Sequence, residues 1–85
     1  MKDEKELLEL GQFYFLNNKF QKAIEIFGQL LKEEKTNYDA MYNLGLSYEA
    51  LNDFDNAKIF YKQALGIKAD HVRAKEHLQK LIGKE

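Results

Sequence analysis

The sequence predicts an all-α fold built from antiparallel helix pairs, and three observations favour it. Apolar residues recur at three- and four-residue spacing, no segment alternates polar and apolar residues as a strand would, and the 85 residues contain no proline. The breaks between these periodic segments are short and polar. Short connections of this kind force neighbouring helices to lie antiparallel.

Five helices are expected, and residues at their ends support the assignment. Asp3 can cap the first helix, because a carboxylate accepts hydrogen bonds from the free amides of a first turn. Asn18 and Asn52 fall where the first and third helices must end, and asparagine adopts the left-handed conformation more readily than most residues. Asp53 and Asp70 can cap the fourth and fifth helices. The expected ranges are 4–17, 20–34, 38–51, 54–67 and 71–82.

The sequence also repeats itself with a period of 34 residues, and a fixed period of this length indicates a stacked array. The repeated positions are turn residues and residues of the apolar stripes, whereas exposed positions do not repeat. The aligned pairs are Leu10 and Leu44, Gly11 and Gly45, Tyr14 and Tyr48, Asn18 and Asn52, Phe20 and Phe54, Ala23 and Ala57, Phe27 and Tyr61, and Leu31 and Leu65.

Both copies resemble the tetratricopeptide repeat, whose signature is W-x-x-L-G-x-x-Y, then A-x-x-x-F, then P. The residues that carry the resemblance are Leu10, Gly11, Tyr14, Ala23 and Phe27 in the first copy and Leu44, Gly45, Tyr48, Ala57 and Tyr61 in the second. Two family positions differ in both copies. Apolar Leu7 and Met41 replace the tryptophan, and Lys35 and Ala69 replace the proline.

The resemblance implies an α-solenoid that forms a short right-handed superhelix. One repeat would span residues 4–37 and a second 38–71, with a capping helix and tail at 72–85, all within a single domain of residues 1–85. The last segment fits a capping helix, because its apolar residues form one stripe that can cover the helix before it. These residues are Ala74, Leu78, Leu81 and Ile82.

Two glycines stand inside expected helices, where glycine costs about 1 kcal/mol relative to alanine. Gly11 and Gly45 are one repeat period apart, which argues against chance. Their recurrence predicts close packing of the two helices in each pair. Ala23 and Ala57 are the matching small residues on the second helices.

The resemblance further implies a concave groove, lined by the first helix of each pair, in which a protein or peptide partner binds. No enzymatic activity is expected. The candidate partner-binding residues lie on these helices outside the packing signature: Leu8, Gln12, Phe15, Tyr42, Asn43, Leu46, Glu49, Arg73 and His77. Leu8, Phe15, Tyr42 and Leu46 would make apolar contacts, unless packing between the helices buries some of them. Gln12, Asn43 and Arg73 would orient polar groups of the partner.

Some members of this family clamp the C-terminal carboxylate of a partner. The five clamp positions map here to Leu8, Gln12, Asn43, Arg73 and His77. Leu8 and His77 stand where the family has a lysine and an arginine, and the loss of charged partners weakens carboxylate capture. A working clamp is therefore not expected.

Several other function classes are disfavoured. The chain has no cysteine, and His71 and His77 are six residues apart, so they do not share a helix face as metal ligands would. Neither a metal nor a cofactor is expected. Acidic and basic residues are interspersed with a net charge of −1, which disfavours nucleic-acid binding. No run of about 20 apolar residues predicts membrane insertion, and no signal peptide is apparent, so a cytoplasmic location is expected.

Two alternatives to partner binding in the groove stay open. Phe13 aligns with Ser47 of the second repeat, and no preceding repeat in this sequence would cover it. An exposed phenylalanine at the open end of an array favours self-association, as a homodimer or a homo-oligomeric scaffold. The other alternative is that the chain is an excised fragment of a longer repeat protein whose missing repeats cover Phe13.

Overall fold

The structure, a computed structural model, describes residues 2–83, and the all-α prediction is confirmed over that range. The helices are α1 (Glu4–Leu16), α2 (Phe20–Glu33), α3 (Tyr38–Ala50), α4 (Phe54–Ile67) and α5 (Val72–Ile82). Every helix end lies within one residue of its expected position. The last two residues of the expected tail, 84–85, lie outside the described residues.

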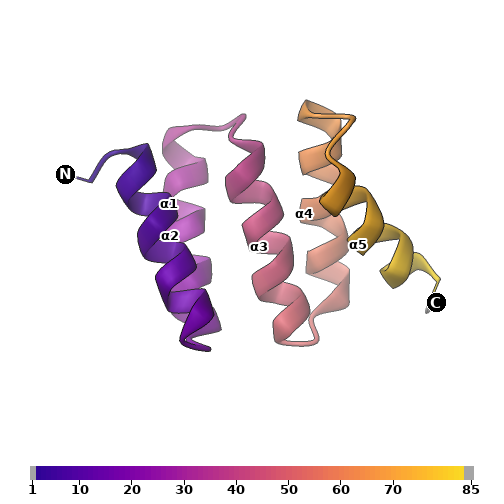
Figure 1. The fold of residues 1–85 in the computed structure, drawn as a ribbon, viewed down its shortest axis with the longest axis horizontal. Coiled ribbons are helices and arrows are strands. Elements are labelled where there is room, and N and C mark those ends of the chain that lie inside the picture. Colours follow the sequence, from indigo (N-terminus) through magenta and orange to yellow (C-terminus); the bar gives the residue numbers. More distant parts are fainter. Residues whose placement is uncertain (1, 84–85) are drawn as a thin grey trace.

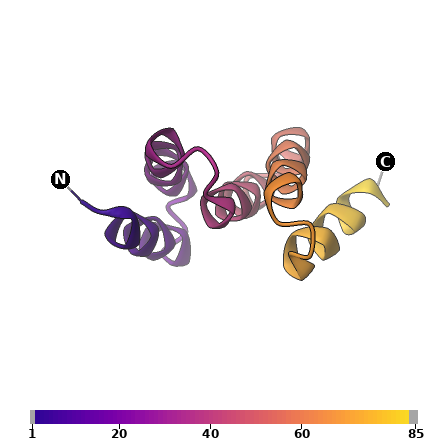
Figure 2. The ribbon, with the colours of Figure 1, turned by 90° about the horizontal axis from the view of Figure 1, so that it is seen from above.

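Consecutive helices lie antiparallel and stack along the long axis of the molecule (Figure 1). Seen from above, they form two layers, with α1, α3 and α5 in one and α2 and α4 in the other (Figure 2). Helix α3 is set back between α1 and α5, so the three-helix layer is concave. The molecule measures 40 × 26 × 17 Å, and its two ends are therefore well separated.

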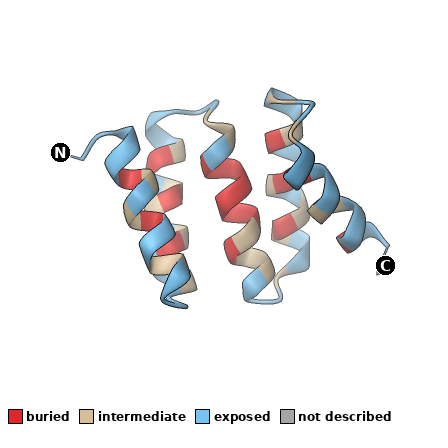
Figure 3. Cartoon of the chain, in the orientation of Figure 1, coloured by how far each residue is buried: buried red, intermediate tan, exposed pale blue. Residues whose placement is uncertain are grey.

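The core lies between the two layers, and α3 contributes most to it (Figure 3). Helix α3 is covered on two sides. It packs against α2 of the first pair on one side and against α4, its partner in the second pair, on the other. Ala40 packs against Leu7 and Leu30 of the first pair, and Leu44 packs against Phe27. The first pair therefore buries one face of α3 along most of its length.

The recurring glycines lie beneath aromatic rings of the second helices. A β-carbon built at Gly45 would lie 2.5 Å from Cε1 of Tyr61, and one built at Gly11 would overlap the ring of Phe27. Both rings are completely buried, so neither can move aside into solvent. The predicted close packing is confirmed, and the space left by each glycine is filled by a side-chain ring.

The predicted turns are also confirmed. Asn18 and Asn52 both have φ of 61°, the left-handed conformation expected of them. The Asp3 carboxylate accepts a hydrogen bond from the Glu6 amide at 2.8 Å, and the Asp53 carboxylate caps α4 in the same way. These polar residues satisfy backbone groups that the helices themselves leave unpaired.

The expected cap of α5 is wrong. His71, not Asp70, caps this helix, because Nδ1 of His71 accepts a hydrogen bond from the Ala74 amide at 3.2 Å. Asp70 lies one residue too early, and its carboxylate is 3.4 Å from the Lys68 ammonium. Within α5, Ala74 and Leu81 are buried against α4 as predicted, whereas Ile82 is 47% exposed because it lies at the edge of the stripe.

The contact between Gly45 and Tyr61 predicts that Gly45→Ala destabilises the fold. Overpacking a filled core costs about 1–3 kcal/mol, whereas alanine gains about 1 kcal/mol over glycine in a helix interior. Because the added β-carbon would overlap a completely buried ring, we expect the upper end of this cost. The free energy of unfolding should then fall by about 2 kcal/mol in urea denaturation followed by circular dichroism. The matched control is Gly66→Ala, because a β-carbon there meets nothing within 4 Å and should stabilise α4. Similar stabilisation by both substitutions would contradict this account.

The left-handed turn at Asn52 gives a second prediction. Alanine in this conformation costs about 1–2 kcal/mol, whereas glycine adopts it freely. We expect Asn52→Ala to lower the melting temperature and Asn52→Gly to leave it nearly unchanged, both measured by thermal melts. An alanine variant as stable as the original chain would show that the turn does not depend on this conformation.

Candidate functional site

The concave layer of α1, α3 and α5 contains two adjoining cavities. The larger, of about 440 Å³, lies between α3 and α5 and is lined by Tyr42, Arg73, Glu76, His77 and Lys80. The smaller, of about 240 Å³, involves all three helices and is lined by Phe15, Leu46, Glu49, Ala50 and His77. His77 lines both cavities, so together they form one groove.

Six of the nine predicted partner-binding residues line these cavities, and three do not. Leu8 is half-buried and packs against the core between α1 and its neighbours. Gln12 is exposed on α1. Asn43 is only 9% exposed, and its side-chain amide donates to the Asp39 carbonyl at 2.8 Å. Asn43 is therefore bonded within its own helix, and the six groove residues are Phe15, Tyr42, Leu46, Glu49, Arg73 and His77.

A single carboxylate joins three helices at the floor of the groove. Oε1 of Glu49, on α3, accepts a hydrogen bond from the hydroxyl of Tyr61 on α4 at 2.7 Å. The same oxygen lies 3.0 Å from Nδ1 of His77 on α5. The side chains of Glu49 and His77 are 24% and 28% exposed, so this network lies at the boundary between core and groove.

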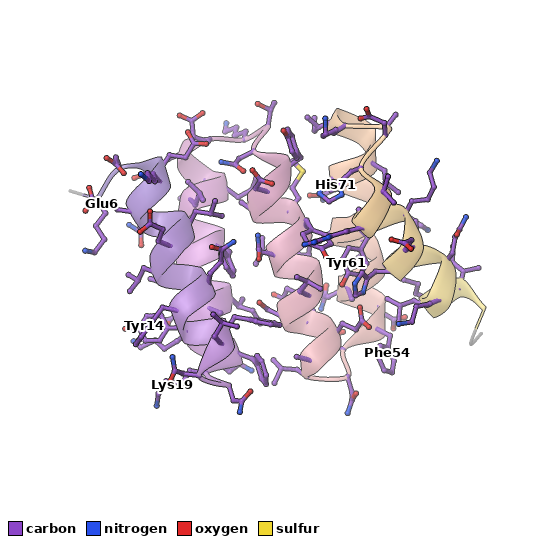
Figure 4. All side chains as sticks on the ribbon, in the orientation of Figure 1. Glu6, Tyr14, Lys19, Phe54, Tyr61 and His71 are labelled. Atoms are coloured by element: carbon purple, nitrogen blue, oxygen red, sulfur yellow. The ribbon has the colours of Figure 1, made fainter. Side chains whose placement is uncertain are left out.

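Aromatic rings surround the same network. The ring of Tyr42 lies 4.8 Å from His71, 5.9 Å from His77 and 5.9 Å from Tyr61, measured between centroids. Figure 4 shows Tyr61 and His71 between α3 and α5. Tyr42 is only 9% exposed and is covered by the rings of Tyr61 on α4, His77 on α5 and His71, which precedes α5. It therefore forms the floor of the larger cavity, and little of its ring is available to a partner.

The two floor tyrosines are held in their protonated form. Burial raises the pKa of Tyr61 above its ordinary value of 10.0, and the hydrogen bond and charge of Glu49 raise it further. Burial also raises the pKa of Tyr42, although the Arg73 guanidinium opposes this shift. Near neutral pH the Tyr61 hydroxyl is therefore a donor, which fits its bond to the carboxylate.

Tyr61 belongs to the site but is not among the residues predicted for it, although the repeat contains a signal for this residue. Phe15 and Phe27 occupy the positions one period before Glu49 and Tyr61. An apolar pair in the first repeat is thus replaced by a hydrogen-bonded pair in the second. The substitution of phenylalanine by tyrosine is conservative alone, but its coincidence with a new carboxylate indicates a polar contact.

This network predicts how Tyr61→Phe affects stability. The ring should still fit, because Phe27 fills the equivalent place, and the lost hydrogen bond should cost about 1 kcal/mol at neutral pH. The raised pKa of Tyr61 stabilises the folded chain below pH 10.0, and this contribution is lost as pH rises above that value. Urea denaturation over a pH series should therefore show the difference between the two chains shrinking at alkaline pH. A difference that does not change with pH would contradict the role of the hydroxyl.

Two kinds of feature are absent from the part of the chain that the structure describes. Within residues 2–83, no group of three or more histidine, aspartate or glutamate side chains could hold a metal ion. No described helix combines the length and apolar character that crossing a membrane requires.

Comparison with known families agrees with this architecture. One tetratricopeptide repeat model matches residues 7–36, which cover most of α1 and all of α2. A second matches residues 38–71, which cover α3 and α4. A comparison with curated proteins found no match. Since the two matches fall on the two helix pairs and together span most of the sequence, the chain belongs to the tetratricopeptide repeat family.

Proposed function

We propose that this chain is a non-enzymatic interaction module that binds a peptide or protein partner in the groove between α1, α3 and α5. Tetratricopeptide repeats are generally protein–protein interaction modules. Curved repeat arrays of this kind present an extended concave surface for binding. The observation that carries the proposal is the pair of adjoining cavities on the concave layer.

The two cavities offer different chemistry. Phe15 and Leu46 are half-buried in the smaller cavity, where they can hold an apolar side chain of the partner. Arg73, Glu76 and Lys80 are exposed around the larger cavity, where they can pair with polar or charged groups. An apolar anchor beside orienting polar groups is the usual composition of a binding site.

The side chains that form the floor of the groove are fixed by contacts with neighbouring helices, and this order supports the proposal. Glu49 is bonded to side chains from two other helices, and Tyr42 is packed between aromatic rings. A surface that is already ordered loses little conformational freedom on binding, which favours affinity. Tyr42 and Glu49 would therefore shape the groove, while Phe15, Leu46, Arg73 and His77 would contact the partner.

A second candidate function, a self-assembling scaffold, is favoured by one observation. Phe13 is 59% exposed on the side of α1 away from the core, and its ring contacts only that of Tyr14 among the described aromatic rings. This residue lines neither cavity. Self-assembly through Phe13 would therefore use a surface separate from the groove.

The proposal predicts that Leu46→Glu abolishes partner binding. It places a carboxylate in the smaller cavity beside Glu49, where an apolar side chain should dock. Loss of a central apolar contact typically costs at least 2 kcal/mol, or about a 30-fold loss of affinity. Pull-downs from a lysate of the source cells, analysed by mass spectrometry, would compare this variant with the original chain.

Ile59→Glu is the matched control for this experiment. It makes the same chemical change at an apolar residue of α4 that is 48% exposed and lines neither cavity. Partners that bind in the groove should be retained by Ile59→Glu and lost with Leu46→Glu, provided both variants keep their helical circular dichroism. Partners retained equally by both variants would contradict binding in the groove.

A further inference from the structure

The outer side of α1 is a face that the fold leaves uncovered. In α3, Ala40 and Ser47 are completely buried, and Ala40 packs against the first helix pair. One repeat period earlier, the same positions of α1 hold Glu6 and Phe13, and both are exposed. With Glu9, which also lies on this side of the helix, they form the N-terminal face. Figure 4 shows Glu6 at the outer edge of α1.

The residues of the N-terminal face define what could cover it. A helix pair packed as the first pair packs on α3 would bury Glu6 where Ala40 is buried, and an unpaired buried carboxylate is costly. A matching surface must instead bring a cation to Glu9 and an apolar contact to Phe13, and must leave the carboxylate of Glu6 in contact with solvent. The N-terminal face thus fits a helix that is both basic and partly apolar.

The opposite end of the molecule presents such a helix. On α5, Val72, Lys75, Gln79 and Ile82 lie at i, i+3, i+7 and i+10, which places them on one stripe. All four are exposed, with Val72 at 65% and Ile82 at 47%. This stripe, the C-terminal face, is separate from the stripe of Ala74 and Leu81 that packs on α4.

The two helices also have complementary charge. The N-terminal face carries Glu6 and Glu9 and no cation, whereas the C-terminal face carries Lys75 and no acidic residue. If the two helices are aligned in the same direction with Glu9 opposite Lys75, Glu6 falls opposite Val72 at the start of α5 and Phe13 falls opposite Gln79, one turn before Ile82. Complementary charge of this kind steers two surfaces together and sets their register.

We infer that a second copy of this chain covers the N-terminal face with its C-terminal face, an inference that rests on the self-assembling scaffold proposed above as the second candidate function. The two faces lie at opposite ends of the 40 Å long axis, so one molecule cannot join its own ends (Figure 1). Each copy instead uses its α1 on one neighbour and its α5 on another, which is a head-to-tail contact. Contacts of this type produce rings or open filaments rather than a closed dimer.

The first test uses Phe13→Ser, which installs the residue found at the equivalent position of α3. The original chain should show a weight-average mass in sedimentation equilibrium that rises as concentration approaches about 1 mM, whereas the variant should stay monomeric. Thermal melts should show that the variant remains folded, because Phe13 is mostly exposed. A monomeric original chain, or a variant that assembles equally well, would overturn the inference.

The second test uses charge reversal and distinguishes head-to-tail contact from pairing of two α1 helices. Glu9→Lys and Lys75→Glu should each raise the dissociation constant about tenfold, since each places like charges in contact. The chain carrying both changes, and an equimolar mixture of the two single variants, should assemble as the original does. Assembly that is insensitive to Lys75→Glu, or is not restored by the double change, would overturn the inference.

Discussion

The packing of one aromatic ring over one glycine, made once in each repeat, is the contact on which the other features depend. Phe27 covers Gly11 and Tyr61 covers Gly45, and in both cases no β-carbon could be accommodated. The glycine weakens its own helix by about 1 kcal/mol, but the ring it admits is completely buried. This contact sets the distance between the two helices of each pair, and hence the positions of all the residues that stack on them.

In the second repeat, the ring that covers the glycine also carries a hydroxyl group that forms a hydrogen bond. The hydroxyl of Tyr61 extends past Gly45 to the carboxylate of Glu49, which also meets His77. A residue that fills the space over a glycine therefore also positions Glu49 at the floor of the groove, where its carboxylate links α3 and α4 to His77 of α5. The first repeat, with Phe27 and Phe15 in these places, has no such bond and leaves an apolar wall for the smaller cavity. The chemical difference between the two ends of the groove follows from this pair of substitutions.

Most of the fold could be predicted from the sequence because its determinants are local and repeated. Gly11 and Gly45 indicated close packing, and Asn18 and Asn52 marked the turns, in each case through a property of the residue itself. The cap of α5 could not be predicted in the same way. Aspartate and histidine can both accept from a helix amide, and the path of the chain after α4 decides which of them does.

The site was less predictable, because its geometry depends on contacts between distant residues. Tyr42 is buried through rings from the segment after residue 60, and Glu49 meets its partners 12 and 28 residues away. The periodic pattern of apolar residues along one helix cannot predict such contacts between distant residues. Asn43 shows the opposite error. Its position on the first helix of a pair predicted that it faces the groove, whereas its side-chain amide donates a hydrogen bond to the Asp39 carbonyl of its own helix.

The separation of surfaces on α1 and α5 links the two proposals. On α5, one stripe packs on α4, a second with Arg73 and His77 lines the groove, and a third with Val72 and Lys75 faces outward. On α1, Phe15 faces the groove while Glu6 and Phe13 face outward. A head-to-tail contact would therefore leave both cavities open. It would also place α1 of one copy beside α5 of the next, so that each copy in the assembly keeps its own groove.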